Sequence, residues 1–151
     1  MDVRRKFSLP DRYLFYPAQF WEHKNHENLL RALALSRGRG LDLKLVLVGS
    51  AKNHHARVMA RIDELGLSDA MRVLGYVSND EMVSLYREAT ALTFVSRIGP
   101  TNIPPLEAMA CGTPVVASNR GAIPEITGDA AVLADADDDA ALAHGLADVL
   151  T

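Results

Sequence analysis

Short apolar segments of strand length recur along the chain, and each is followed by a segment in which apolar residues return every three or four positions. The apolar segments are rich in Val, Leu and aromatic residues and alternate little, which is typical of strands buried on both faces of a parallel sheet. They lie at residues 13–18, 43–49, 71–77, 91–96, 114–118 and 130–134. The segments between and after them predict helices at 25–37, 53–65, 80–89, 105–111, 123–127 and 138–150. This alternation predicts a doubly wound α/β fold with a parallel sheet of about six strands.

Residue signals at the ends of these segments support the helix assignments. Ser78 is followed three residues later by Glu81, which is the spacing of a capping box at a helix N-terminus. Gly66 and Gly112 follow predicted helices, at positions where a left-handed residue commonly ends a helix. The prolines at 104 and 105 suit a first helical turn, because the amide hydrogens that they lack have no partner there.

Length and charge narrow the classes of protein. The chain has 151 residues, of which 48% are hydrophobic, so it can bury a core of its own, and we expect one domain over residues 1–151. The formal charge of −3 argues against nucleic-acid binding, which usually leaves a basic footprint. Residues 1–118 hold 15 of the 16 Lys and Arg residues but 12 of the 19 Asp and Glu residues. This excess of basic residues in residues 1–118 would suit an anionic ligand. We interpret the acids of residues 119–151 as the start of a solvated helix.

Other chemistry is limited by what the sequence lacks. Cys111 is the only cysteine, so an internal disulfide is excluded, and no histidine or cysteine spacing resembles a zinc site. No apolar run approaches the roughly 20 residues of a membrane helix, and the start of the chain lacks the apolar core of a signal peptide. We expect a cytoplasmic protein without a metal site, and peripheral membrane contact through a further domain stays open.

The expected fold indicates where a ligand would bind. In open parallel sheets, ligands bind beyond the carboxyl ends of the strands, on loops that lead into helix N-termini. The polar residues of these loops include Gln19, Lys24, Asn53, Asn102 and Arg120. Helix N-termini and Lys24 favour a phosphate-bearing ligand, to which Arg120 could contribute unless it faces solvent. The motifs of dinucleotide-binding enzymes, phosphate-loop ATPases and serine hydrolases are missing, so those three functions have no support.

The segment GPTNIPPLEAMACGTPVVASNRGAIPE, residues 99–125, carries the most specific pattern. It resembles the donor-binding signature of retaining GT-B glycosyltransferases, whose usual form is Glu-Gly-Phe-Gly-Leu-Pro-x-x-Glu-Ala-x-Ala-x-Gly-x-Pro-Val-Val. Read back from Glu107, the match is nearly complete, but the family's first glutamate falls on Gly99. Either the donor sugar is recognised differently, through Thr101 and Asn102, or catalysis is lost. We favour altered recognition, because the rest of the signature is intact.

The resemblance covers essentially the whole chain. Lys24 matches the family's phosphate-binding lysine, and Gln19 stands in the place of its arginine. Gly49 matches the glycine at the end of the second strand, and the main chain near Val77 would receive the nucleobase, with Tyr86 in the next helix. The resemblance implies a Rossmann-like domain, one half of a GT-B fold, that binds a nucleotide-diphosphate sugar (NDP-sugar) without a metal or other cofactor.

Glu107 and Lys24 have chemistry that suits these roles. Glu107 would lie about three residues into a helix begun by the prolines, where its carboxylate meets the positive helix end and can accept hydrogen bonds from two ribose hydroxyls. Its alternative role is to stabilise that helix end by about 0.3–1 kcal/mol. Lys24 could neutralise the leaving diphosphate, or it could be an ordinary surface lysine. Gln19 carries no charge, so we expect most of the leaving-group stabilisation from Lys24.

Other residues keep two interpretations. The backbone N–H groups of Thr101, Asn102 and Ile103 could bind phosphate or sugar hydroxyls, or these residues could only form a rigid turn. Tyr76 could flank the base or belong to the core, and we favour the core. The aromatic and histidine residues at 21–26 fit a domain interface as well as a catalytic site.

The expected function is therefore that of a glycosyltransferase donor domain, which serves retaining transfer of a sugar to an acceptor hydroxyl in glycan or cell-surface polysaccharide biosynthesis. An N-terminal GT-B domain would supply the acceptor site and a histidine near the reacting carbon, so we expect this chain to be a fragment that is inactive alone. The alternatives are half of a sugar-nucleotide epimerase and a non-catalytic nucleotide-binding or interaction domain. The epimerase would need acid and base carboxylates in a loop that has none.

Overall fold

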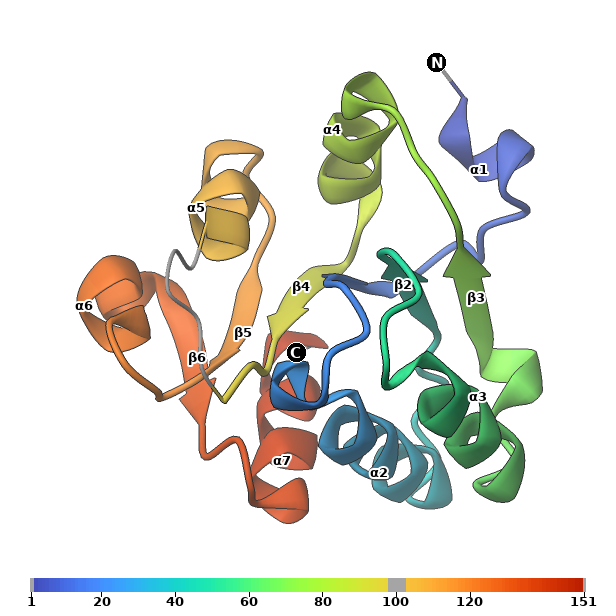
Figure 1. The fold of residues 1–151 in the computed structure, drawn as a ribbon. Coiled ribbons are helices and arrows are strands. Elements are labelled where there is room, and N and C mark those ends of the chain that lie inside the picture. The colour runs from blue at the N-terminus through green and yellow to red at the C-terminus, as the bar shows by residue number, and fades with distance from the viewer. Residues whose placement is uncertain (1, 98–102, 151) are drawn as a thin grey trace.

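The computed structural model describes residues 2–97 and 103–150, and its centre is a six-stranded sheet (Figure 1). The strand order is β3-β2-β1-β4-β5-β6, and every pair is parallel. The strands are β1 (Leu14–Pro17), β2 (Leu45–Val48), β3 (Met71–Leu74), β4 (Ala91–Phe94), β5 (Val115–Ser118) and β6 (Ala131–Ala134). Each lies within a segment that the sequence predicts as a strand. The predicted doubly wound α/β fold is therefore confirmed.

Helices cover both faces of the sheet. α2, α3 and α7 lie together on one face, and α4, α5 and α6 lie on the other (Figure 1). The α-helices are α1 (Val3–Lys6), α2 (His26–Gly38), α3 (His55–Glu64), α4 (Asn79–Glu88), α5 (Ile103–Ala110), α6 (Ile123–Thr127) and α7 (Asp139–Leu150). Short 3-10 helices occupy Glu22–Lys24, Ser68–Ala70 and Gly128–Ala130. Sequence reasoning missed α1, because four residues are too few to show a helical period.

The predicted helix ends are present. The Ser78 hydroxyl accepts a hydrogen bond from the Glu81 amide at 3.1 Å, and a Glu81 carboxylate oxygen accepts one from the Ser78 amide at 2.8 Å, so the capping box is complete. Gly66 and Gly112 have φ values of 67° and 75°, which glycine adopts without the penalty of a Cβ atom. α5 begins at Ile103 and not at residue 105, because prolines at its second and third positions need no hydrogen-bond acceptor.

The core is centred on the inner strands. All residues of β2, β4 and β5 are buried, which explains why their sequences do not alternate between apolar and polar residues. In β1, Leu14, Phe15 and Tyr16 have no exposed surface, and Leu14 pairs with both Leu45 of β2 and Ala91 of β4. Within residues 2–97 and 103–150, none of the helices combines the length and apolar character needed to cross a bilayer.

The central position of β1 determines where a ligand crevice can form. β1 lies between β2 and β4, and the helices that follow β1 and β4, α2 and α5, run on opposite faces of the sheet (Figure 1). The chain therefore leaves the neighbouring ends of β1 and β4 toward opposite faces of the sheet. This position is the topological switch point, where doubly wound sheets bind ligands. Gln19 and Lys24, the predicted site residues on the loop after β1, lie at this point.

Candidate functional site

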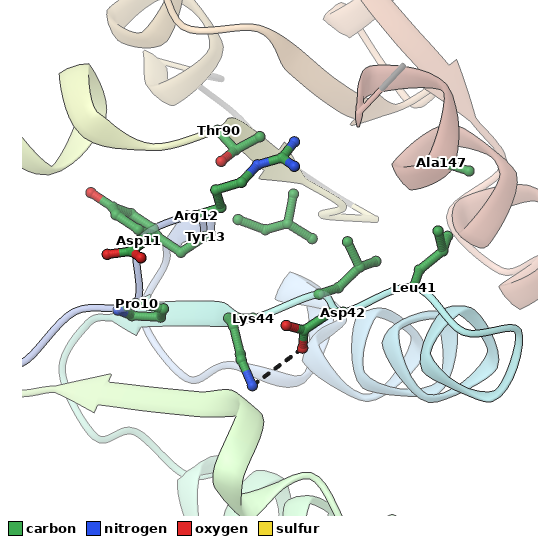
Figure 2. Close-up of a pocket in the computed structure, with 11 residues that line it drawn as sticks. Pro10, Asp11, Arg12, Tyr13, Leu41, Asp42, Lys44, Thr90 and Ala147 are labelled. Atoms are coloured by element: carbon green, nitrogen blue, oxygen red, sulfur yellow. Dashed lines mark ion pairs between the residues drawn. The ribbon is translucent and has the colours of Figure 1, made fainter.

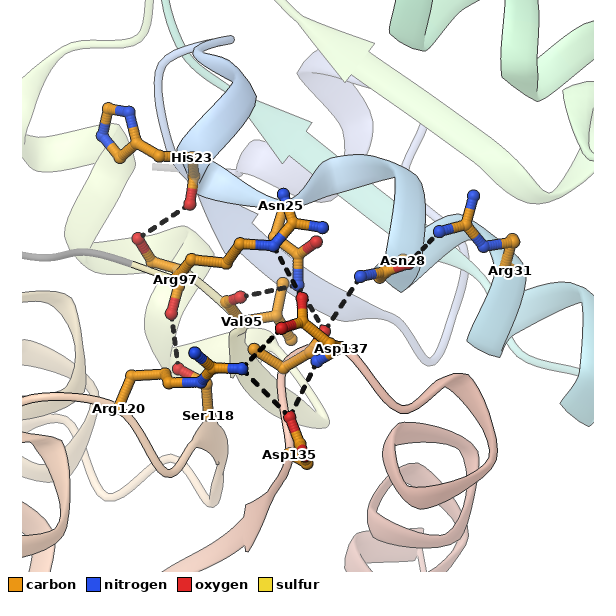
Figure 3. A network of polar contacts seen from close by, with 12 residues as sticks. His23, Asn25, Asn28, Arg31, Val95, Arg97, Ser118, Arg120, Asp135 and Asp137 are labelled. Atoms are coloured by element: carbon orange, nitrogen blue, oxygen red, sulfur yellow. Dashed lines mark hydrogen bonds and ion pairs between the residues drawn. The ribbon is translucent and has the colours of Figure 1, made fainter.

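The loops after β1 and β4 are joined by hydrogen bonds at the switch point (Figure 3). The amide of Arg97 donates to the carbonyl of His23 at 2.8 Å, and the Ser96 hydroxyl donates to the same carbonyl at 3.3 Å. The Asn25 side-chain amide donates to the carbonyl of Val95 at 3.0 Å. The described start of the β4 loop is therefore held against the loop that carries Lys24.

Asn25 also joins the loop after β6 to this junction. Its side-chain amide donates to the Ala136 carbonyl at 2.7 Å, and that of Asn28 donates to the same carbonyl at 3.0 Å. Asn25 is buried and has a φ of 67°, a left-handed conformation that asparagine tolerates better than most residues. These contacts fix the start of α2, which places Lys24 directly before a helix N-terminus.

Lys24 is a half-buried cation in this loop. Its carbonyl accepts a hydrogen bond from the Tyr16 hydroxyl at 2.6 Å, so its backbone is anchored to β1. Burial lowers the pKa of the Lys24 ammonium, because the charged form is less well solvated there. In the part of the chain that the structure describes, Lys24 forms no ion pair, so an anionic ligand would meet an uncompensated charge.

His26 lies beneath the Lys24 loop and not on its surface. It is 1% exposed, stacks on Phe20 with ring centroids 4.7 Å apart, and lies 5.0 Å from the Tyr16 ring. Burial, together with the nearby charges of His54 and Lys24, lowers the pKa of His26 to about 3, although the Ala18 backbone acts in the opposite direction. His26 is therefore a neutral packing residue, so for this histidine both the interface and the catalytic interpretation are wrong.

Gly49 brings the loop after β2 into close contact with the loop after β1. A Cβ atom at this position would lie 2.2 Å from the carbonyl oxygen of Ala18, which no side chain can tolerate without movement of the main chain. Gln19, which follows Ala18 in the chain, is exposed, and its side-chain oxygen accepts a hydrogen bond from the Trp21 indole at 3.0 Å. The Gln19 side-chain NH₂ group is the part that could still donate to a ligand.

Glu107 occupies the fifth position of α5, because the helix begins at Ile103. The expectation that its carboxylate meets the positive end of the helix is therefore wrong, since that effect is confined to the first turn, which contains no acid. Instead, the Tyr86 hydroxyl from α4 donates a hydrogen bond to Glu107 Oε1 at 3.3 Å. Glu107 is exposed, so the rest of its carboxylate is accessible to a ligand.

The remaining predicted residues on this edge differ in exposure. Tyr76 is 91% exposed in the loop after β3, so our preference for a core position is wrong. Val77 is partly buried against the core, and Ile103, the first residue of α5, is 49% exposed. The predicted residues Gly99, Thr101 and Asn102 lie outside the described residues.

Arg120 is paired with acids and does not reinforce Lys24. Its guanidinium lies 3.2 Å from Asp135 and 2.6 Å from Asp137, which also pairs with Arg97 at 2.7 Å (Figure 3). Hydrogen bonds to these acids raise the pKa of Arg120, and those from the two arginines lower the pKa of Asp137. The interpretation of the acidic tail as a helix start holds for Asp138, whose carboxylate accepts the Ala141 amide at 3.0 Å.

A cavity of about 580 Å³ lies at the other end of the sheet, where the strands begin (Figure 2). Residues that line it include Tyr13, Leu14, Leu43, Lys44, Thr90 and Ala147. Lys44 is paired there with Asp42 at 3.3 Å. The cavity is separated from the predicted site by the length of the strands, so we do not assign the ligand to it. Among the described residues, no group of three metal-ligating side chains occurs.

Known sequences resemble this chain over most of its length. The O-antigen chain mannosyltransferase B of Escherichia coli is 32% identical over 147 residues, which are 95% of this chain and 39% of that protein. The MMP alpha-(1->4)-mannosyltransferase of Mycolicibacterium hassiacum is 35% identical over 106 residues, which are 70% of this chain and 25% of that protein. The chain thus spans about two fifths or less of the length of these curated relatives.

Solved structures have the same fold. Sucrose-phosphate synthase from Thermosynechococcus elongatus has a TM-score of 0.79 at 28% identity, over 97% of this chain and 38% of that one. Anabaena HepE in complex with UDP and glucose has a TM-score of 0.84 at 22% identity, over 98% of this chain and 40% of that one. The family described as Glycosyl transferases group 1 matches residues 2–151. The chain therefore belongs to the group 1 glycosyltransferases, as the signature around Glu107 predicted.

Proposed function

We propose that this chain is the donor domain of a glycosyltransferase and binds the nucleotide of an NDP-sugar at the carboxyl edge of its sheet. The observation that carries this proposal is the meeting of three separate loops at that edge. The Lys24 loop is hydrogen-bonded to the β4 loop and in close contact with Gly49, and α5, which follows the β4 loop, carries the exposed Glu107 as its fifth residue. Membership of the glycosyltransferase family supports this reading of the geometry.

Each part of the nucleotide has a residue suited to it. The diphosphate would lie at Lys24 and the start of α2, where a cation without an ion-pair partner in the described chain and a helix N-terminus without a side-chain cap favour negative charge. Glu107 would accept hydrogen bonds from the ribose hydroxyls. The base would lie against the loop that holds Tyr76 and Val77, where an exposed aromatic ring is available for stacking.

The reaction proposed is retaining transfer of the sugar to an acceptor hydroxyl. The bond between the anomeric carbon and the diphosphate breaks, a bond to the acceptor oxygen forms on the same face of the sugar, and the hydroxyl proton leaves with the nucleoside diphosphate. Lys24, assisted by Gln19, would stabilise the negative charge that develops on the leaving diphosphate. A second domain would supply the acceptor site, and the sugar would be recognised with Gly99 in place of an acid, through Thr101, Asn102 and Ile103.

Calorimetric titration with UDP, GDP, ADP and CDP tests this proposal. We expect one of them to bind with 1:1 stoichiometry, equally in EDTA and in magnesium, and Glu107→Ala to weaken it. GDP-mannose belongs in the panel, because two of the relatives are named mannosyltransferases. Failure of every nucleotide to bind would contradict the proposal, and binding that Glu107→Ala leaves unchanged would favour a non-catalytic domain.

A further inference from the structure

Tyr86 is a buried tyrosine whose hydroxyl reaches the exposed Glu107 of α5. Its side chain comes from α4 and is 2% exposed. The ring makes an edge-to-face contact with Phe15 of β1, with centroids 5.2 Å apart. Its backbone carbonyl accepts a hydrogen bond from the buried Thr113 hydroxyl at 2.5 Å. The ring is therefore held by the core at one side, and its hydroxyl meets Glu107 at the other.

We propose that Tyr86 is a positioning residue, which orients the Glu107 carboxylate so that its free lone pairs face the two ribose hydroxyls. This inference rests on the proposed function, because it needs a nucleotide at the carboxyl edge. An ionised carboxylate has about four lone-pair sites, and the Tyr86 hydroxyl uses one of them on Oε1. The sites on Oε2 stay available for a ligand.

The physical reason for such a residue is the exposure of Glu107. A glutamate on a helix surface populates several rotamers, and fixing one of them costs side-chain entropy when the ligand binds. A hydrogen bond from a rigid, buried donor reduces that cost in advance. Burial and the neighbouring Glu107 both raise the pKa of Tyr86, so its hydroxyl remains a donor across the pH range in which enzymes work.

The alternative is that the hydroxyl only satisfies its own hydrogen-bonding need, as buried tyrosines usually do. Tyr13 is a matched example of that case. It is 1% exposed, it also makes an edge-to-face contact with Phe15, and its hydroxyl donates to the Leu85 carbonyl at 2.8 Å. Removal of the Tyr13 hydroxyl takes one donor from the Leu85 carbonyl, which still accepts a hydrogen bond from the Ala89 amide at 3.2 Å, and it does not affect Glu107.

The experiment measures recognition of the ribose and not affinity alone. UDP and GDP are each compared with their 2′,3′-dideoxy analogues by calorimetry, for wild type, Tyr86→Phe, Tyr13→Phe, Glu107→Ala and the double variant Y86F/E107A. For wild type we expect the ribose form to bind about tenfold or more tightly, since a charged hydrogen bond is at stake. Tyr86→Phe should lower this preference about threefold or more, while Tyr13→Phe leaves it unchanged.

Glu107→Ala should abolish the preference for the ribose form over the dideoxy form. Because Tyr86 acts through Glu107, the double variant Y86F/E107A should show the same preference as Glu107→Ala. An unchanged ribose preference in Tyr86→Phe, with wild type binding as expected, would overturn the positioning role and leave the proposed function intact. A further loss in the double variant would overturn it as well. If wild type and Tyr86→Phe are equally stable to unfolding and wild type binds neither UDP nor GDP, the positioning role of Tyr86 is overturned. The same result rejects a donor nucleotide that contains uracil or guanine.

Discussion

His26 predicts a specific pH dependence of stability for the loop that carries Lys24. Because its folded pKa is about 3 and its ordinary value is 6.5, the unfolded chain binds a proton before the folded chain does as the pH falls. The stability that comes from burying the neutral ring is therefore fully present above about pH 6.5. It is lost progressively as the pH falls from about 6.5 to about 3.

The size of this loss follows from the shift. One pKa unit corresponds to about 1.36 kcal/mol, so the whole shift is worth about 5 kcal/mol, and about 2 kcal/mol of it is lost by about pH 5. The loss is not reduced for solvent screening, because His26 is 1% exposed. Among the described residues, neither ring nitrogen has a hydrogen bond of normal geometry that would stabilise the protonated ring. The pKa values of Glu27, Glu81 and Asp137 are lowered from ordinary values of 4.5, 4.5 and 3.8, so these carboxylates contribute little to the change above about pH 5.

The matched variant is His26→Phe, which keeps an aromatic ring between Phe20 and Tyr16 but cannot be protonated. Urea unfolding is followed by the fluorescence of Trp21, the only tryptophan, from about pH 7.5 to about pH 5. We expect the free energy of unfolding of wild type to fall by about 2 kcal/mol more than that of the variant over this range. Parallel pH profiles for the two proteins would refute the reasoning, whatever their absolute stabilities.

Three further substitutions test other parts of the structure. Lys24→Ala should weaken binding of a nucleoside diphosphate by about 1.5–3 kcal/mol and leave binding of a nucleoside unchanged. Lys44→Ala, at the opposite edge, should change neither affinity. Equal effects of the two substitutions on diphosphate binding would contradict a role for Lys24. Gly49→Ala should destabilise the domain by about 1–3 kcal/mol in urea unfolding, while Gly75→Ala, which has open space around it, should cost much less. Ser78→Ala should cost about 1 kcal/mol, and an unchanged unfolding midpoint would contradict the capping box.

The fold could be predicted because its signals are local. Strands such as β2 and β5 are buried on both faces, so each appears in the sequence as a continuous apolar segment between helical periods. The family signature likewise lies within one continuous segment around Glu107. The exact start of α5 was missed by two residues, because proline is equally acceptable at several positions of a first turn.

The details of the site depend on contacts between distant segments, which no local pattern records. Arg120 looked available for an anion, but the loop after β6 brings Asp135 and Asp137 to it. The hydrogen bond from Tyr86 to Glu107 joins residues 21 positions apart in different helices. Tyr76 shows the opposite case, since an aromatic residue beside a strand suggests burial, yet here the chain has already left the sheet.

The central claim is that the nucleotide binds at the carboxyl edge of the sheet, and NMR titration of the ¹⁵N-labelled chain tests it most directly. The account predicts that a nucleoside diphosphate shifts the amide signals around Lys24, Gly49 and Glu107 and leaves those of Thr90 and Ala147 in place. Shifts centred on Thr90 and Ala147 would assign the ligand to the cavity at the opposite edge and contradict the account.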